Sequence, residues 1–279
     1  LQGPRGQGRL LHGRRSLGRH GRADGPVLQG PAVQLQLLLL VHPQGPHRQE
    51  AGQRFRQDRA LLPRLFEAQR SGFIDAIKLT NHDENRAAED LGKSLPKEKL
   101  AAAVLLTSPG KPYVYQGEEL GYWGRKDGGD EYVRAPIKWT KTGSVPSKAL
   151  NEKVDKDMLS ASISVEAQEA DAGSLLGTYR TFAQLRNNYP ALATGTMTEY
   201  SMSTKTLAAW YLTAGTQKLL VVHNFSDAKA GASFGTEDLS RPIAVSGAGE
   251  VETTTSDGAV KGRTLRLDPW SSAVFLISE

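Results

Sequence analysis

The sequence contains no cysteine, and this absence excludes disulfides, thiolate metal sites and thiol nucleophiles. It also lacks a long apolar run. The most apolar stretch of the first third, VQLQLLLLV at 33–41, is much shorter than the ~20 residues that span a bilayer. This stretch has no small-residue cleavage site and lies too far inside the chain to be a signal peptide. The sequence therefore shows neither a membrane span nor a targeting signal, and the localisation stays unknown at this point.

Many residue types are also missing from the start of the chain. Before residue 73 there is no Lys, Ile, Asn, Thr, Tyr, Trp or Met. Residues 1–66 hold 11 Arg and 3 acidic residues, a net charge of +8, which leaves −3 for residues 67–279 out of the total of +5. Without β-branched residues or Lys/Glu surfaces, this segment is predicted to be disordered or non-native. The basic pI near 9.3 belongs to this segment alone.

From Phe73 onward the sequence has ordinary secondary-structure signals. FIDAIKLT (73–80) has the apolar, β-branched composition of a buried parallel strand. SLPKEKLAAAVLLTSPG (94–110) predicts a helix with a cap at Ser94, an early Pro96 and a Pro-Gly stop. KPYVYQGEELG (111–121) then returns to a short strand and a glycine-containing loop. Strand, helix and strand in this order indicate a βα unit of a parallel sheet.

The second half of the chain changes its period. A polar stretch at 124–171 has no clear repeat, and SLLGTYRTFAQLRNNYPAL (174–192) has the apolar spacing of a helix that ends before Pro190. Beyond Gly195, five short segments read as strands separated by Gly, Asp and Ser turns: TLAAWYLT, KLLVVHNF, RPIAVSG, RTLRLDP and SSAVFLIS. We expect an α/β domain at 67–194 and an all-β sandwich at 195–279.

Polar side chains follow the first predicted strand directly. They are Asn81, His82, Asp83, Glu84, Asn85 and Arg86. In (β/α)8 barrels the carboxyl ends of the strands carry the catalytic side chains, so Asp83 would be a carboxylate held beside an imidazole and a guanidinium. The alternative is structural, because Asn, His and Asp also favour turns and helix caps.

Three linked motifs resemble one family. IKLTNHDENR is followed about thirty residues on by GKPYVYQGEELGYWG and then by DEYVRAPIKW. Together they resemble the last two strands of the catalytic barrel of the α-amylase family, glycoside hydrolase family 13. Asn81, His82 and Asp83 match the family's strand-seven segment. The strand-eight pattern matches Pro112, Tyr113, Tyr115, Gly117, Glu119 and Gly121, while Gln116 departs where a second Tyr is usual. The all-β tail resembles the C-terminal domain of the family.

The resemblance implies a function. It implies the C-terminal part of a (β/α)8 TIM barrel followed by a β-sandwich, acting on α-glucans such as starch or maltodextrins with retention of configuration. Asp83 would be the catalytic residue that stabilises the transition state, and His82, Asn81 and Arg86 would bind substrate. For Arg86 the alternatives are orienting a carboxylate and capping the loop. The resemblance also implies an extracellular or periplasmic location, a monomer, and no nucleic-acid partner.

Several further residues allow two interpretations. Tyr122 and Trp123 could stack on a sugar, but packing is the preferred interpretation. Trp139, Trp210 and Trp270 are interpreted as core residues, and His223 as a core or edge histidine. Ca²⁺ is possible by resemblance, and the nearest candidate ligands are Asp127, Asp130 and Glu131. A solvated acidic loop is the preferred interpretation of these three, so no metal ligand is assigned.

The nucleophile and the acid of the family should precede residue 73, yet residues 1–66 contain no such segment as printed. Their composition is that of GC-rich coding DNA read out of frame. A shifted frame permits V-G-E-A within residues 10–18, which resembles the family's strand five, with the glutamate codon straddling Arg15 and Ser16. The normal frame would resume between Arg64 and Glu67. We therefore expect 1–66 to be frame-shifted and the printed chain to be inactive.

Two other functions remain open from the sequence. A non-catalytic amylase-like carbohydrate-binding protein, such as a transporter-associated homologue, would keep the fold and lose the carboxylates. Alternatively, residues 1–66 could be a genuine basic extension that binds nucleic acid through its arginines. The second alternative lacks the aromatic residues that usually stack on bases.

Overall fold

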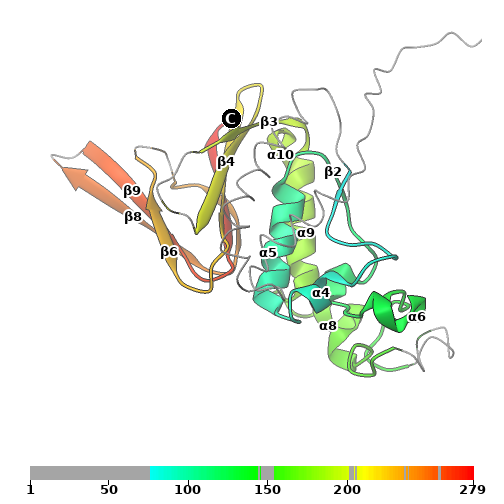
Figure 1. The fold of residues 1–279 in the computed structure, drawn as a ribbon. Helices are drawn as coiled ribbons and strands as arrows, with labels where there is room; N and C mark the ends of the chain where they lie inside the picture. The colour runs from blue at the N-terminus through cyan, green and yellow to red at the C-terminus, as the bar shows by residue number, and fades with distance from the viewer. Residues whose placement is uncertain are drawn as a thin grey trace, which may run out of the picture.

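The computed structural model describes residues 76–143, 145, 154–200, 204, 206–235, 237, 239–256 and 259–279. The expectations for residues 1–66, including the leucine-rich run and the shifted frame, lie outside this part. The described chain forms a helical part that contains a parallel strand pair, followed by a β domain (Figure 1). Within it, no helix is both long and apolar enough to cross a membrane.

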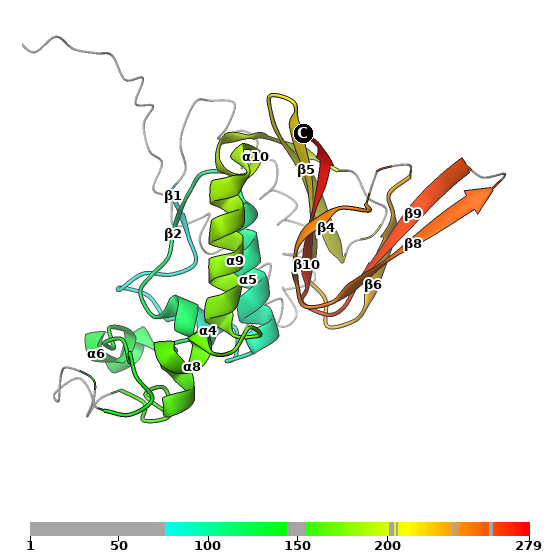
Figure 2. The same ribbon diagram turned by 180° about the vertical axis from the view of Figure 1, so that it is seen from behind.

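The predicted βα unit is present. Strand β1 (Ala76–Lys78) pairs in parallel with β2 (Lys111–Tyr113), and helices α4 (Ala87–Asp90) and α5 (Leu95–Thr107) connect them. A parallel pair with a helical crossover is the repeating unit of a (β/α)8 barrel, as the predicted fold requires. Figure 2 shows β1 and β2 running on one side of α5 and α9.

Helix α5 is exposed at its first two residues and buried at every residue from Leu100 to Thr107. Ser94 occupies the N-cap position and Pro96 the first turn, as predicted, but the Ser94 hydroxyl makes no capping hydrogen bond. The helix ends at Thr107, because Ser108 precedes Pro109 and adopts an extended conformation. Its all-apolar sequence AAAVLL is explained by neighbours on both sides, since it lies between the strand pair and the β domain.

The polar stretch after β2 forms short helices without long regular elements. These are the 3-10 helices η2 (Glu118–Leu120), η3 (Lys126–Gly128) and η4 (Ala161–Ile163), and the short α-helices α6 (Asp130–Val133) and α8 (Val165–Glu169). They enclose a small apolar cluster of their own, made of Leu120, Tyr122, Ala135, Val154 and Met158.

Helix α9 (Leu175–Asn188) confirms the predicted amphipathic helix. The Ser174 hydroxyl accepts a hydrogen bond from Gly177 N at 3.0 Å and caps its start. Buried Leu175, Tyr179, Phe182 and Leu185 form its core stripe. A short helix α10 (Pro190–Thr194) follows at once, and strand β3 begins at Thr196, so the change to β structure falls beside the expected boundary at 195.

The β domain consists of two antiparallel sheets. One has the order β3-β4-β5-β10-β7 and the other β6-β9-β8. The strands are β3 (Thr196–Glu199), β4 (Leu207–Ala214), β5 (Gln217–Asn224), β6 (Ala230–Ser233), β7 (Pro242–Ser246), β8 (Gly249–Ser256), β9 (Ala259–Leu267) and β10 (Ser272–Ser278). The five predicted strands correspond to β4, β5, β7, β9 and β10, and the sequence missed β3, β6 and β8.

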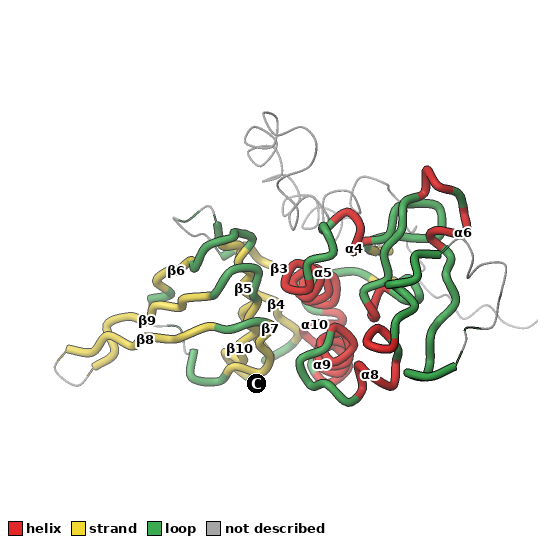
Figure 3. Tube along the Cα trace, turned by 90° about the horizontal axis from the view of Figure 1, so that it is seen from below, coloured by secondary structure: helices red, strands yellow, loops and turns green. Residues whose placement is uncertain are grey.

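The five-stranded sheet is the middle of three layers (Figure 3). Along β5, Leu219 and Val221 pack toward helices α5 and α9, while Leu220 and Val222 pack toward the three-stranded sheet. Both faces are therefore buried, which explains why KLLVV is continuously apolar. Trp210 and His223 lie in this core at 2 % and 0 % exposure, as predicted. Trp270 is only partly buried and packs at its margin beside Lys97.

Candidate functional site

The segment Asn81-His82-Asp83 forms a turn at the carboxyl end of β1. The Asn81 side-chain oxygen accepts a hydrogen bond from Asp83 N at 2.7 Å. This is the turn chemistry that the sequence suggested as the structural alternative, and it fixes the backbone that carries Asp83. The turn and the exposed carboxylate occur together, because Asp83 keeps 60 % of its side chain exposed.

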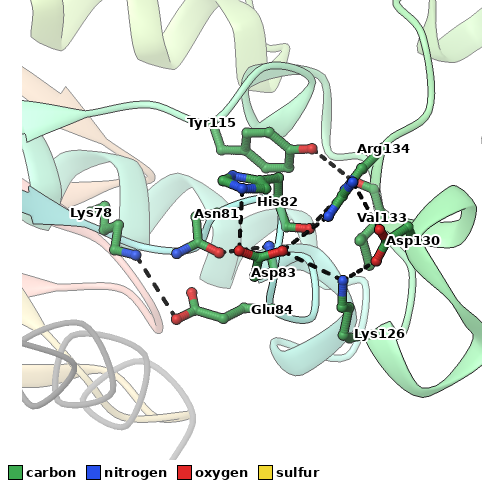
Figure 4. Close-up of polar contacts among 10 residues, drawn as sticks. All are labelled: Lys78, Asn81, His82, Asp83, Glu84, Tyr115, Lys126, Asp130, Val133 and Arg134. Carbon is green, nitrogen blue, oxygen red and sulfur yellow. Dashed lines mark hydrogen bonds and ion pairs between the residues drawn. The ribbon is translucent and has the colours of Figure 1, made fainter.

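Three cationic or imidazole groups surround the Asp83 carboxylate (Figure 4). Arg134 Nη2 donates to Oδ1 at 2.9 Å and Lys126 Nζ lies 3.6 Å from the same oxygen. His82 Nε2 lies 3.2 Å from Oδ2 and, like Asp83, has 60 % of its side chain exposed. The carboxylate is thus oriented by partners from two different loops, while the exposed side of His82 and Asp83 remains accessible to a ligand.

Asp130 ties the two cations together. Its carboxylate lies 2.8 Å from Arg134 Nη1 and also accepts a hydrogen bond from Lys126. The pKa of Asp130 lies below its ordinary value, chiefly because of that hydrogen bond from Lys126, with Arg134 adding to the effect. Arg134 also donates through Nε to the His82 carbonyl at 3.1 Å. The sequence missed Lys126 and Arg134 as site residues, although Arg134 lies inside the recognised motif DEYVRAPIKW.

Arg86, three residues after Asp83, is only 1 % exposed. Its guanidinium donates to the Gln116 carbonyl at 2.5 Å and lies 4.2 Å from the centre of the Tyr115 ring. Burial lowers its pKa despite the nearby Glu118 and Glu119. Its backbone N–H donates to the Gly124 carbonyl at 3.0 Å. Arg86 therefore contacts protein groups and ties the Asp83 turn to the loop after β2, one of the two roles left open for it.

Two glutamates, the buried Glu118 and the partly buried Glu119, act electrostatically on Arg86. Burial raises the pKa of Glu118 to about 8 and also raises the pKa of Glu119. Glu118 accepts a hydrogen bond from the Tyr179 hydroxyl at 2.7 Å and a longer one from Thr80 at 3.4 Å. Through Thr80, these contacts join the segment between β1 and Asp83 to η2 and α9.

The segment 130–139, which we call the strap, runs from the cluster across the loop after β2. Its backbone is held by three side chains of that loop. Tyr115 donates to Val133 O at 3.0 Å, Gln116 to Ala135 O at 2.9 Å, and Tyr122 to Pro136 O at 3.2 Å. The Tyr122 hydroxyl also accepts from Lys138 N at 2.8 Å. Gln116, the departure from the family pattern, is thus one of the groups that fix the strap.

The aromatic residues divide into packed and exposed ones. Tyr122 is 1 % exposed and Trp123 is partly buried, so packing is confirmed for Tyr122. Trp123 Nε1 donates to Asp155 at 2.9 Å. The expectation that Trp139 is a core residue is wrong, because 65 % of Trp139 is exposed. Trp139 lies between Lys138 and Thr140 at the end of the strap, and residues 140–143 that follow it are exposed.

The acidic loop does not fit a calcium ion in this structure. Asp127 pairs with Arg125, and Asp130 pairs with Lys126 and Arg134. In the part of the chain that the structure describes, no group of three or more His, Asp or Glu side chains is placed to hold a metal. Ca²⁺ prefers about six to eight oxygen ligands, so these paired carboxylates do not form such a site.

A parallel βα unit with a carboxylate and an imidazole at the carboxyl end of a strand matches the class of barrel enzymes, whose catalytic groups lie at these strand ends. Residues 43–195 match the family described as alpha amylase, catalytic domain, and residues 207–274 match the alpha-amylase SusG C-terminal domain. The chain therefore belongs to the α-amylase family. The first match begins at residue 43, which lies within the segment 1–66 that we expect to be frame-shifted. The boundary of that segment stays a prediction.

Individual relatives agree with this assignment. The chain is 44 % identical over 213 residues to alpha-amylase SusG of Bacteroides thetaiotaomicron, which covers 74 % of this chain and 30 % of that protein. It is 31 % identical over 179 residues to alpha-amylase 3 of Dictyoglomus thermophilum, which covers 64 % of this chain and 36 % of that protein. The chain thus spans about a third of the length of these curated relatives.

A solved α-amylase structure from H. orenii shares the fold. It superposes with a TM-score of 0.69 at 23 % identity and covers 90 % of this chain and 48 % of that one. At this identity the likeness establishes the architecture alone.

Proposed function

We propose that the described residues form the C-terminal part of the active site of an enzyme that hydrolyses α-glucosidic bonds in starch or maltodextrins with retention. The observation that carries this proposal is the exposed Asp83 carboxylate at the carboxyl end of β1, held by Arg134 and facing the same side as His82. Family membership supports the substrate class.

Asp83 would act as the transition-state stabiliser. A carboxylate that accepts hydrogen bonds from sugar hydroxyls strengthens its contacts as the ring distorts, and only such differential contacts raise the rate. Arg134 and Lys126 keep the carboxylate in one orientation, so little ordering remains to be done when the sugar binds. His82 would contact the same sugar, whereas Asn81 and Arg86 would act mainly by fixing the turn.

We infer that the 279-residue chain by itself does not hydrolyse starch. Retention needs a nucleophilic carboxylate and an acid about 5–5.5 Å apart across the scissile bond, and the printed sequence offers neither at the family's positions. Measurable release of reducing sugar from starch by the purified chain would refute this inference. A tryptic peptide from residues 1–64 in the natural protein would argue against a shifted frame.

The role of Asp83 is tested in the enzyme expressed from the recovered upstream reading frame. We expect Asp83→Asn to lower kcat by about 10²–10³-fold, because it removes a charge that acts on the transition state. Asp127→Asn is the matched control, since Asp127 pairs with Arg125 away from Asp83. A wild-type kcat in Asp83→Asn would overturn the assignment.

The second candidate is a non-catalytic α-glucan-binding protein of the same fold. The observation in its favour is that Asp83 is already paired with Arg134 and Lys126, which suits a binding surface as well as a catalytic one. Upstream codons for Asp and Glu at strands four and five would support the enzyme, and their absence would support the binding protein. A monomeric state and a location outside the cytoplasm remain predictions from the family resemblance.

A further inference from the structure

Trp139 is the most exposed large apolar side chain in the described part of the chain, at 65 % exposure. A second aromatic residue of the strap, Tyr132, is 39 % exposed. Single exposed apolar residues are common and need no explanation. Here, however, two exposed aromatic rings flank Arg134, the residue that holds Asp83.

The backbone beneath Trp139 is held in place. The Trp139 carbonyl accepts a hydrogen bond from Glu166 N at 3.0 Å, and the Lys138 carbonyl accepts one from Val165 N at 3.0 Å. The Glu166 carboxylate in turn accepts from Lys141 N at 2.9 Å. The start of α8 therefore anchors both sides of Trp139. The indole is presented on a fixed turn, so a ligand would not have to order this backbone.

The strap connects Trp139 to the candidate active site. Trp139 follows Arg134 by five positions in the sequence, so the two Cα atoms lie at most about 18 Å apart. Between them, Gln116 and Tyr122 hold Ala135, Pro136 and Lys138 by hydrogen bonds. The backbone that carries the indole is consequently held in place relative to Arg134, which contacts Asp83.

We propose that Trp139 is a stacking platform for a glucose ring of an α-glucan chain whose other end lies at Asp83. This inference rests on the proposed function and specifies its substrate as an oligosaccharide of several units. One face of a glucopyranose ring exposes C–H bonds and its rim carries hydroxyls. A flat indole buries the apolar face, and its Nε1–H, like the Glu166 carboxylate on the adjoining turn, can bond to hydroxyls.

The stacking role of Trp139 is tested by varying the length of the oligosaccharide ligand. The 279-residue chain is titrated by isothermal titration calorimetry with maltose and with maltoheptaose. We expect the wild type to bind maltoheptaose about tenfold more tightly than maltose, a difference that corresponds to one stacked ring. Trp139→Ala should lose this preference and bind maltose as the wild type does, while Trp139→Phe should retain part of it.

Two further variants complete the test. Val251→Ala removes an exposed apolar side chain of the β domain and should leave both affinities unchanged. Asp83→Asn should weaken maltose and maltoheptaose equally. If it weakens neither while Trp139→Ala weakens maltoheptaose, the platform stands and the proposed role of Asp83 falls. The platform itself is overturned by a Trp139→Ala chain that keeps the wild-type preference, or by a wild type without any preference for maltoheptaose.

Discussion

His223 shows how a single buried side chain joins the two parts of the molecule. Its Nε2 lies 3.2 Å from the Thr107 hydroxyl at the end of α5, and its Nδ1 lies 2.7 Å from the Ser272 hydroxyl on β10. The ring is fully buried against Trp210, with ring centres 4.8 Å apart. Burial lowers its pKa from 6.5 to about 3, so His223 is neutral at physiological pH.

A pH dependence of stability follows from this lowered pKa. Below pH 6.5 the unfolded chain binds a proton at His223 that the folded chain does not, so the free energy of unfolding falls as pH drops from about 6.5 toward 3. The loss amounts to several kcal/mol, on the order of 1.4 kcal/mol for each pKa unit. We expect His223→Gln to show a smaller loss over this range in urea unfolding at a series of pH values.

The comparison with the variant is necessary because buried glutamates act in the opposite direction. Burial raises the pKa of Glu98 to about 7 and of Glu118 to about 8. They are protonated in the folded chain where the unfolded chain has released the proton, so their contribution to stability falls as pH rises from about 4.5 to 8. Parallel pH profiles for the wild type and His223→Gln would contradict the assignment to His223.

Among the site residues, a sequence motif predicts the positions of contiguous residues and does not predict their distant partners. Asn81, His82 and Asp83 are contiguous and follow a recognisable strand, so their position could be predicted. Their partners could not, since Arg134 lies 51 residues away from Asp83 and contacts it only after the strap has folded across the loop. The prediction that Trp139 is a core residue was wrong for a similar reason, because the backbone contacts that place Trp139 on the surface come from Val165 and Glu166 at the start of α8.

At the scale of elements, α9 closes the end of α5 through one side chain. Arg186 donates to the carbonyls of Leu106 at 3.0 Å, Ser108 at 2.9 Å and Gly110 at 2.5 Å. Carbonyls at a helix C-terminus have no partner within the helix, so a buried end requires donors from elsewhere. Arg186 supplies them and is only 8 % exposed.

Removing this cap should be costly. We expect Arg186→Met to lower the free energy of unfolding by about 3–5 kcal/mol, because it leaves buried carbonyls without donors. Arg180→Met is the matched control on the same helix. Arg180 is half exposed and pairs with Glu169, so its loss should change stability by no more than ~0.5–1 kcal/mol. Equal effects of the two substitutions in urea unfolding would show that the cap contributes nothing.

Two of the three strands that the sequence missed, β6 and β8, share a simple property. β6 (Ala230–Ser233) is made of small residues, and β8 (Gly249–Ser256) has exposed or polar residues along most of its length. Both lie in the outer sheet and pair with β9, which carries the buried Leu265 and Leu267. Such strands form because a neighbour offers backbone hydrogen bonds, and this information is not present in their own side chains.

At the scale of the whole molecule, the helical part and the β domain share one core. Residues of α5, α9 and α10 belong to the same apolar cluster as residues of β4, β5 and β10. A shared core of this kind makes the two parts unfold together, even though their families are described as separate domains.

Cooperative unfolding can be tested with adjacent core residues. Leu219 faces the helices and Leu220 faces the outer sheet, and both are fully buried. We expect Leu219→Ala and Leu220→Ala each to lower stability by about 2–5 kcal/mol. In both variants, the helical and β circular dichroism signals should melt in one common transition. Two separated transitions in the wild type would show that the parts fold independently.

The sequence by itself determined the class of the protein. Local periodicity placed α5, α9 and five strands, and three motifs placed Asp83 at the end of a barrel strand, since both signals lie within short stretches of chain. Only the tertiary structure decided which groups surround Asp83, that Arg86 is buried, that Trp139 is exposed, and that the middle sheet is covered on both faces. These features depend on contacts between residues far apart in the sequence, and no local pattern encodes such contacts.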